Sequence, residues 1–235
     1  MTSQTASKHI CYYNNSKLSI QDVGKCHILP TKLNFMADFR PTPDKDQIAL
    51  LEPFERLGLP RITVVSNAAQ AQEAFVTLSA AKVLGFDTES KPTFAKDEVS
   101  TGPHIVQLST AAHAWVIQLH DVACRNLVAT FLAQHTGAKV GFGLGDDIRR
   151  ITAKLGVEAN HVIDLNHLFR EQGYRKDMGV KAAVALLFNK RFLKSKKAAT
   201  SNWANPHLTE AQIVYAANDA YAAIRVFDAM QTGIG

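Results

Sequence analysis

The sequence predicts an α/β protein in which a mixed β-sheet is flanked by α-helices. Three short apolar stretches follow one another with no helical pattern between them, which indicates adjacent strands. Beyond them, strand-like and helix-like stretches alternate, and this order favours parallel strands joined by helices. The third observation is an uninterrupted helical pattern from Leu208 to Met230, which contains no proline or glycine.

The individual elements can be placed along the chain from their apolar periods and their capping residues. The expected strands are short and rich in β-branched residues, and they cover 62–65, 83–89, 104–110, 114–119, 138–142 and 162–165. The expected helices begin at capping or polar residues, and they cover 44–56, 67–78, 121–134, 146–155, a stretch ending near 173, 179–188 and 208–230.

The chain divides by composition into three parts. Residues 1–39 are polar and lack any period, so we expect a poorly ordered N-terminal extension, of which the first 35 residues are dispensable. Residues 40–60 are expected to form a helical lead-in, because an amphipathic helix fits Asp44 to Arg56. The functional domain is then expected to span residues 61–231.

Composition excludes several classes of protein and favours none strongly. No apolar run reaches the eighteen or so residues that cross a bilayer, and no secretory signal is recognisable, so an intracellular, cytoplasmic protein without membrane contact is expected. The three scattered cysteines form neither a zinc pattern nor a disulfide framework. A net charge of +5 weakly favours a polyanionic partner.

Two acidic residues, Asp87 and Glu89, lie two positions apart in the apolar stretch VLGFDTE. If this stretch is a strand, both side chains leave the same face, because side chains alternate with a period of two. Two acids on one face repel each other and lose hydration, and a divalent cation removes both costs. The alternative is that the strand ends at Phe86 and that both acids are solvated turn residues.

A second acidic pair, Asp146 and Asp147, follows the stretch KVGFGLG. This stretch is not a dinucleotide-binding loop, because the fingerprint that begins at Gly141 needs glycine at position 146, where an acid would repel a pyrophosphate. One of the two aspartates could instead be a helix N-cap, which is a common structural use. That alternative accounts for one acid of the pair and leaves the other unexplained.

The long predicted helix carries Tyr215 and Asp219, four residues apart. Four residues are about one helical turn, so the phenol and the carboxylate project from the same face. Thr209 followed by Gln212 is a capping-box pattern at the start of this helix. An acid on a buried helix needs a partner, and we expect that partner to be a metal ion. The alternative for Tyr215 is a core aromatic.

Taken in order, these segments resemble the DEDD superfamily of 3′-5′ exonucleases, in its tyrosine-bearing branch. The resemblance is carried by 86–89, 139–147 and 215–219, with further likeness at Ser201–Trp203. The histidine branch would place histidine at position 214, which is valine here. Over about residues 61–231 the sequence is most similar to Werner-type exonuclease domains and more distantly to ribonuclease D. It departs from the Werner type at Ser90-Lys91-Pro92, where an aromatic residue and prolines are usual.

The resemblance implies a ribonuclease H-like fold and two divalent cations, Mg²⁺ or Mn²⁺, held by four carboxylates: Asp87, Glu89, Asp147 and Asp219. Asp87 would bridge both ions, and Glu89 and Asp219 would complete the site of the ion that activates the nucleophile. Asp147 would hold the second ion through water. The family places this acid at the ninth residue of the KVG stretch, which makes Asp146 the second choice.

The resemblance also implies residues that meet the substrate. Tyr215 would orient the attacking water, since a phenol with a pKa near 10 suits positioning rather than proton abstraction. Five of the eight residues in 190–197 are basic, and Trp203 follows, which suits phosphates and a stacked base of a single strand. Lys194 is expected to contact a phosphate, and Phe142 to pack near the terminal nucleotide. The alternatives are a solvated loop with Trp203 against the core, and Phe142 as a buried strand residue.

Three hypotheses about function follow. The first is a metal-dependent 3′-5′ exonuclease that acts on a free 3′ end, single-stranded or recessed, and releases nucleoside 5′-monophosphates; the Werner-type resemblance favours DNA over RNA. The second is a catalytically weak nucleic-acid-binding relative with the same fold. The third is a two-metal phosphoesterase acting on short oligonucleotides. Asp164 and the nine histidines show no ligand spacing and are expected to be structural.

Overall fold

The computed structural model describes residues 40–93, 98 and 100–232. The extension expected at residues 1–39 lies outside this described part. Six strands form one sheet, and their bounds are β1 Ile62–Val65, β2 Val83–Glu89, β3 Ile105–Ser109, β4 Ala114–Gln118, β5 Ala138–Gly141 and β6 Val162–Asp164. The strand order across the sheet is β1-β4-β3-β2-β5-β6. The predicted mixed α/β fold is therefore confirmed.

The sheet combines an antiparallel centre with parallel flanks. β2, β3 and β4 form an antiparallel meander, in which Asp87 of β2 lies opposite Gln107 of β3. β1 runs parallel to β4, and β5 and β6 run parallel to β2. β5 pairs with β2 only as far as Gly85, so the C-terminal end of β2, with Asp87 and Glu89, is bordered by β3 alone.

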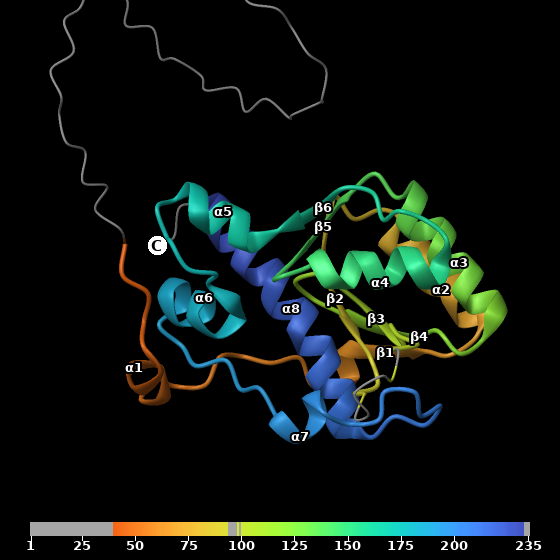
Figure 1. Cartoon of the computed structure of the whole chain (residues 1–235), viewed down its shortest axis with the longest axis horizontal. Helices are drawn as coiled ribbons and strands as arrows, with labels where there is room; N and C mark the ends of the chain where they lie inside the picture. Colours follow the sequence, from red (N-terminus) through yellow and green to blue (C-terminus); the bar gives the residue numbers. More distant parts are fainter. Residues whose placement is uncertain (1–39, 94–97, 99, 233–235) are drawn as a thin grey trace, which may run out of the picture. The chain divides into compact units, whose positions relative to one another are not determined.

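Helices cover both faces of the sheet (Figure 1). They are α1 Lys45–Ala49, α2 Ala68–Leu78, α3 Val122–Gln134, α4 Gly145–Leu155, α5 Leu165–Glu171, α6 Gly179–Phe188, α7 Lys196–Ala199 and α8 Glu210–Thr232. α2, α3 and α4 bury one face, where Leu84 and Phe86 of β2 belong to the core. α8 buries the other face, and α6 packs against α8. The two cores share the sheet, and the odd-numbered residues of β2 point toward α8.

α8 lies very close to the central strand. A Cβ atom added at Gly85 would stand 1.9 Å from the carbonyl oxygen of Ala220, so only glycine permits this approach. The predicted capping box is present, since Gln212 N donates to Thr209 Oγ1 at 3.3 Å and Thr209 N donates to Gln212 Oε1 at 3.0 Å. The close contact sets the distance between the side chains that β2 and α8 present to each other.

The predicted helix over Asp44 to Arg56 is much shorter than expected. It ends at Ala49, because Pro53 cannot donate a backbone hydrogen bond and disfavours helical geometry in the residue before it. The chain instead runs extended, and Pro53 forms a β-bridge with Arg191. Leu50, expected on the apolar side, is 88% exposed, whereas Phe54 is buried.

The remaining predicted elements match the structure within one or two residues. Short segments without a strong period were not predicted: the 3₁₀ turn Leu59–Arg61 and α7, which lies in the basic stretch. Among the described residues, no helix has both the length and the apolar character that a membrane span requires.

Candidate active site

The strand interpretation of the first acidic pair is correct. β2 continues to Glu89, so Asp87 and Glu89 leave the same face as Gly85, the face that α8 covers. Both side chains are half-buried rather than solvated. The hydrogen bond from Thr88 N to Asp87 Oδ1, at 2.8 Å, comes from the neighbouring residue of the same strand.

α8 brings its tyrosine and aspartate to the same place. Tyr215 and Asp219 are buried, and they lie one turn apart on the helix that packs against β2. Asp219 Oδ2 is 2.9 Å from the Lys194 ammonium, which also lies 5.3 Å from the centre of the Tyr215 ring. Phenol, carboxylate and ammonium therefore form one group beside the acids of β2.

The two aspartates of α4 have different surroundings. Asp147 accepts a hydrogen bond from Thr88 of β2 and is half-buried, whereas Asp146 is exposed and forms an ion pair with Arg149 of its own helix. Burial raises the pKa of Asp147, although the Thr88 hydrogen bond opposes the shift. Neither aspartate is the N-cap, which is Leu144. Asp147 is the one that points to the acids of β2.

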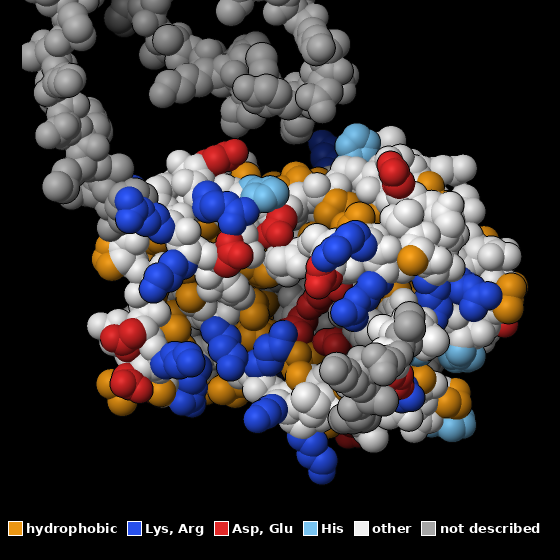
Figure 2. All heavy atoms as spheres, in the orientation of Figure 1, with side chains coloured by type: hydrophobic (Ala, Val, Ile, Leu, Met, Phe, Trp, Pro, Cys, Tyr) orange, Lys and Arg blue, Asp and Glu red, His pale blue; other side chains and the backbone are white. Residues whose placement is uncertain are grey.

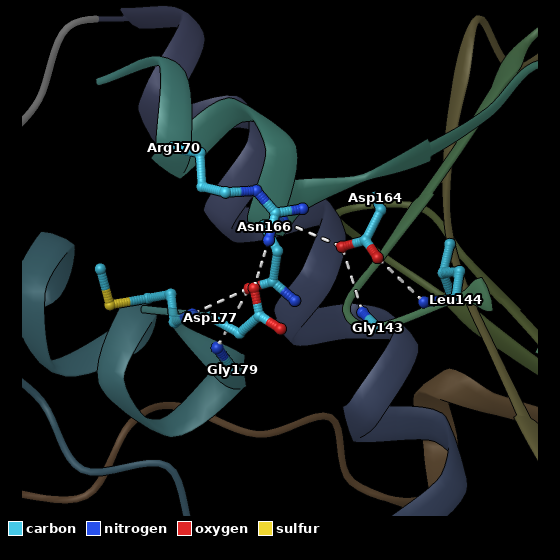
Figure 3. A network of polar contacts seen from close by, with 8 residues as sticks. Gly143, Leu144, Asp164, Asn166, Arg170, Asp177 and Gly179 are labelled. Carbon is cyan, nitrogen blue, oxygen red and sulfur yellow. Dashed lines mark hydrogen bonds and ion pairs between the residues drawn. The ribbon is translucent and has the colours of Figure 1, made fainter. Parts of the chain in front are cut away.

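A polar network holds the loop that leads into α4. Asp164, at the end of β6, accepts from the backbone N–H groups of Gly143 and Leu144 at 3.1 Å each and of Asn166 at 2.9 Å (Figure 3). Asn166 Oδ1 in turn accepts from Met178 N at 2.9 Å, which ties α5 to the start of α6. Gly143 has a φ of +66°, a conformation that side chains rarely adopt. The expected structural role of Asp164 thus includes placing Asp147.

The acids influence one another across the three segments. Burial, followed by the charges of Asp219 and Asp147, raises the pKa of Asp87 well above its ordinary value. Burial and the charge of Asp87 raise the pKa of Glu89 to about 9. Burial also raises the pKa of Asp219, although Lys194 opposes this shift. Carboxylates that oppose one another's ionisation in this way require positive charge nearby if all are to be ionised.

Lys194 supplies one positive charge to the group. Burial disfavours its charged form, but the charges of Asp219 and Asp87 outweigh burial, so the pKa of Lys194 is raised. Burial, and next the charge of Asp219, also raises the pKa of Tyr215, which keeps the phenol protonated. A single ammonium leaves the remaining carboxylates uncompensated.

The donor set fits a hard divalent cation. The acids offer oxygen ligands without cysteine or histidine, which suits Mg²⁺ or Mn²⁺. Asp219 Oδ1 is buried without a hydrogen-bond partner in the described structure, as a ligand atom would be. As they stand, the described residues include no group of three or more His, Cys, Asp or Glu side chains that would hold an ion. Binding would therefore require these side chains to turn toward one another.

A family comparison covers the segments that form this site. Residues 62–234 match the family described as 3′-5′ exonuclease, and this range contains β2, α4 and α8 with all the acids described above. The chain belongs to the 3′-5′ exonuclease family.

Several curated relatives carry the family name. A 3′-5′ exonuclease of Arabidopsis thaliana is 26% identical over 150 residues, which are 63% of this chain and 52% of that protein. The bifunctional 3′-5′ exonuclease/ATP-dependent helicase WRN of Mus musculus is 24% identical over 159 residues, which are 67% of this chain and 11% of that protein. The chain spans about half or less of the curated relatives that it matches.

Solved structures show the same fold at low identity. The EXO domain of Aedes aegypti Nibbler has a TM-score of 0.64 at 20% identity, covering 76% of this chain and 90% of that one. Escherichia coli RNase D has a TM-score of 0.62 at 18% identity, covering 73% and 44%. The expected ribonuclease H-like fold is therefore confirmed, and the WRN and RNase D likenesses support the DEDD superfamily.

The residues expected to meet a substrate fall into different environments. Lys194 forms an ion pair with Asp219 at 2.9 Å. Trp203 is 1% exposed and packs 6.0 Å from the Tyr215 ring, so no base can stack on it in this structure and the core alternative is the correct one. Phe142 is half-buried, stacks 6.5 Å from Phe169, and lines a cavity that reaches the acids.

Cavities adjoin the acids on both sides of the Lys194–Asp219 ion pair. One, of about 700 Å³, is lined by Asp87, Phe142 and residues of α1 and α6, and a second, of about 520 Å³, is lined by Tyr215 and Arg56. Lys194 and Asp219 line both. In the space-filling view, acidic side chains lie in a hollow with Lys and Arg side chains around it (Figure 2). Acidic side chains at the centre suit metal ions, and the basic side chains around them suit a polyanion.

Gln107 of β3 was missed by sequence reasoning. It lies opposite Asp87 across the ladder, so the two side chains share a face. Gln107 is fully buried, and neither its amide nitrogen nor its amide oxygen has a hydrogen-bond partner in the described structure. A buried amide without a partner is costly, and its position suits donation to the Asp87 carboxylate. The alternation in HIVQLST, which turns this polar side chain inward, was the available signal.

Proposed function

We propose that this chain is a metal-dependent 3′-5′ exonuclease of the tyrosine-bearing branch, which hydrolyses the terminal phosphodiester bond of a nucleic acid and releases a nucleoside 5′-monophosphate. The observation that carries the proposal is the electrostatic coupling of acids from β2, α4 and α8 around Tyr215. Buried carboxylates that oppose one another's ionisation destabilise the fold, so their convergence is best explained by the chemistry they perform.

Two divalent cations, Mg²⁺ or Mn²⁺, would be held by the four carboxylates: Asp87, Glu89, Asp147 and Asp219. Bound there, the ions would stabilise negative charge on the attacking and leaving oxygens of the phosphodiester. Asp87 is best placed to serve both ions, because the charges of Asp219 on one helix and Asp147 on another both raise its pKa. Asp146 is not a ligand in this proposal, since it is engaged with Arg149.

Tyr215 would position the attacking water. Its raised pKa keeps the phenol protonated at neutral pH, so the hydroxyl orients a water molecule rather than removing its proton. Packing against Trp203 and the ammonium of Lys194 fixes the ring. This assigns Trp203 a supporting position behind the tyrosine instead of a direct contact with a base.

Lys194 and Phe142 would contact the substrate. Lys194 lines both cavities, so its ammonium can meet a phosphate that approaches from either one. Phe142 lines the larger cavity with Asp87, where an aromatic ring would pack on the terminal nucleotide. The substrate would be a nucleic acid with a free 3′ end, either single-stranded or recessed.

The sugar preference is a separate part of the proposal. The Werner-type resemblance favours DNA, whereas the solved structures of similar fold include a Trypanosoma brucei RNase D in complex with RNA U12. Recognition of the 2′-hydroxyl depends on local pocket geometry, so both substrates belong in the test.

The decisive experiment follows products from 5′-labelled DNA and RNA of matched sequence, single-stranded and recessed, with Mg²⁺, Mn²⁺ or EDTA. The proposal predicts a ladder of labelled products that have been shortened from the 3′ end, and only when a divalent ion is present. It also predicts mononucleotides as the released product, which chromatography identifies. Binding without products would indicate a catalytically weak relative. Turnover restricted to the shortest oligonucleotides would indicate a phosphoesterase for such substrates.

A further inference from the structure

A third, smaller cavity shares no lining residue with the two that adjoin the acids. Its volume is about 100 Å³, and its wall comes from the start of β3, the end of β4, α3, α4 and the loop before α8. Arg125, Lys154 and two histidines belong to the lining, and none of the described residues that line it is an aspartate or a glutamate. Trp203, which packs against Tyr215, is also part of the wall. The cavity is therefore basic and lies one side chain away from the tyrosine of the candidate site.

Hydrogen bonds fix the wall of this cavity. Leu119 N donates to His104 O at 2.9 Å, and His104 N donates to Glu89 O at 2.8 Å. Gln118 Nε2 donates to Asn205 O at 3.3 Å, which ties the loop before α8 to β4. The cavity therefore belongs to the same hydrogen-bonded framework that carries the acid Glu89.

The positive side chains of the cavity are not neutralised by ion pairs. Lys154 Nζ donates to Thr101 O at 2.7 Å, and the Arg125 guanidinium donates to Leu119 O at 3.4 Å, and both side chains are half-buried. Neither takes part in an ion pair within the part of the chain that the structure describes. Burial, and next the charge of Arg125, lowers the pKa of Lys154. Two half-buried cations that repel each other favour binding of an anion between them.

A line of charged side chains on α4 joins the acids to this cavity. Asp147, Arg150 and Lys154 are spaced by three and four residues, so they lie on one side of the helix. Arg150 is exposed, and its charge opposes the rise in the pKa of Asp147. At 1.5 Å per residue, Lys154 lies about 10 Å along the helix axis from Asp147. Lys and Arg side chains continue from the acidic hollow toward the right, over the region of α4 (Figure 2).

The size of the cavity and its distance from the acids match one phosphate of a longer strand. A volume of about 100 Å³ is the share of roughly three water molecules, which suits a single phosphate group. An exonuclease that takes the 3′ end at its acids leaves the rest of the strand on its surface. Phosphates follow one another at roughly 3.4 Å of rise in a stacked strand and more in an extended one, so about 10 Å spans two or three nucleotides.

We propose that the small cavity is a subsite for one phosphodiester of the substrate strand, two or three nucleotides to the 5′ side of the bond that is cleaved. Arg125 and Lys154 bind this phosphate, and Arg150 contacts the strand between the cavity and the acids. The inference deepens the proposed function, on which it rests for the identity of the ligand.

The test measures equilibrium binding of a 5′-labelled single strand of about 12 nucleotides, as DNA and as RNA, to the full chain by fluorescence anisotropy. EDTA is present throughout, because the subsite needs no metal ion and the strand then stays intact. The variants are Lys154→Gln and Arg125→Gln, with Lys154→Arg as the form that keeps the charge. Lys82→Gln is the matched control, since Lys82 is exposed and precedes β2, at the opposite end of that strand from the acids. Thermal melting establishes that each variant is folded.

Lys154→Gln and Arg125→Gln are each expected to weaken binding by about 3- to 10-fold. The slope of log affinity against log salt concentration should become shallower by about 0.7 in each, because one phosphate contact no longer releases a counterion. Lys154→Arg and Lys82→Gln should match wild type in affinity and in slope. A variant that only loosened the fold would not change the slope by the amount of one contact.

Replacing one phosphodiester at a time with an uncharged methylphosphonate locates the contact along the strand. In wild type, the replacement at the second or third linkage on the 5′ side of the terminal one should cost as much affinity as Lys154→Gln does. In Lys154→Gln the same replacement should cost nothing further, because the two changes remove one shared contact. Additive losses at every linkage would overturn the inference, and so would an affinity and a salt slope that both glutamine variants leave unchanged.

The subsite and the proposed function fail separately. If the phosphate dependence is found but no strand is cleaved with Mg²⁺ or Mn²⁺, the exonuclease proposal fails and the phosphate subsite stands. If strands are cleaved while neither the variants nor the methylphosphonates alter binding, only the subsite fails. A wild type that binds neither strand in EDTA would also overturn the subsite.

Discussion

Two acidic residues near the C-terminal ends of strands β2 and β6 show opposite ways of accommodating a carboxylate. Asp164, the last residue of β6, has three backbone N–H groups directed at its oxygens, all within 3.1 Å. Asp87, near the end of β2, has one such bond, from the adjacent residue, and is surrounded by other acids that raise its pKa. The first carboxylate is compensated by the fold, and the second is not.

The difference separates structural acids from those available for chemistry. Fixed backbone donors stabilise a carboxylate in place, and they leave little room for an external ligand. An acid that lacks them lowers the stability of the protein unless something else supplies positive charge. The same contrast applies to α8, where Asp219 depends on the mobile ammonium of a lysine side chain rather than on backbone donors.

The largest effect is expected from Asp87→Asn, which keeps the shape of the side chain and removes its charge. Hydrolysis of a labelled oligonucleotide should fall by about 1,000-fold or more, since a shared metal ligand is lost. The unfolding free energy in EDTA should stay the same or rise by about 1 kcal/mol, because the mutual repulsion of the acids is reduced. Activity near that of wild type in a well-folded sample would remove Asp87 from the site.

Tyr215→Phe tests the residue next to the acids without changing any charge. The turnover rate should drop by about 10- to 100-fold, because water positioning is lost while the carboxylates remain. Calorimetric titration with Mn²⁺ should give the same affinity as wild type. A variant as fast as wild type would show that the hydroxyl has no part in the reaction and that Tyr215 is only a core aromatic.

Asp164→Ala is expected to lower the stability of the fold much more than the rate of hydrolysis. Three backbone N–H groups lose their acceptor, so the unfolding free energy measured with urea should fall by about 2–3 kcal/mol. Asp164→Asn, which retains one acceptor oxygen, should lose less. Residual activity should far exceed that of Asp87→Asn. Stability unchanged in Asp164→Ala would break the contrast between the two carboxylates.

The last effect concerns Lys139, a buried lysine that donates to His135 O and Gly137 O at 3.1 Å each. Burial lowers its pKa from 10.5 to about 8, so between these values the unfolded chain binds a proton that the folded chain does not. Stability should therefore rise with pH across that window. Lys139→Met should abolish this rise, which is measured as the change in melting temperature between pH 8 and pH 10.5. An identical pH profile in the variant would argue against the shift.

The sequence indicated the fold well because its periods agree with the tertiary structure. Alternation in VLGFDTE placed both acids on one face, and helical spacing placed Tyr215 above Asp219. The helix expected over 44–56 was too long because local amphipathicity gave no indication that the chain would become extended and pair with Arg191, a partner far along the sequence. Long-range pairing of this kind leaves no local period.

The site was predicted less completely than the fold, for a related reason. Trp203 follows a basic stretch, which suggested exposure, but its burial depends on the tyrosine that α8 places beside it. The pairing of Lys194 with Asp219 and the approach of Gln107 to Asp87 likewise depend on which elements the sheet brings together. The type of each side chain showed which interactions it can form. Which of these interactions it does form depends on its neighbours in the folded structure.

The most direct test is the melting temperature of the wild type and Asp219→Asn, each in EDTA and in MnCl₂. Divalent ions bound only by the folded state should raise the wild-type melting temperature by about 4–8 °C at saturating concentration. Asp219→Asn should lose most of that rise, whereas Asp164→Asn should keep it. An equal rise in wild type and Asp219→Asn, or no rise in either, would contradict the view that these acids converge to hold metal ions.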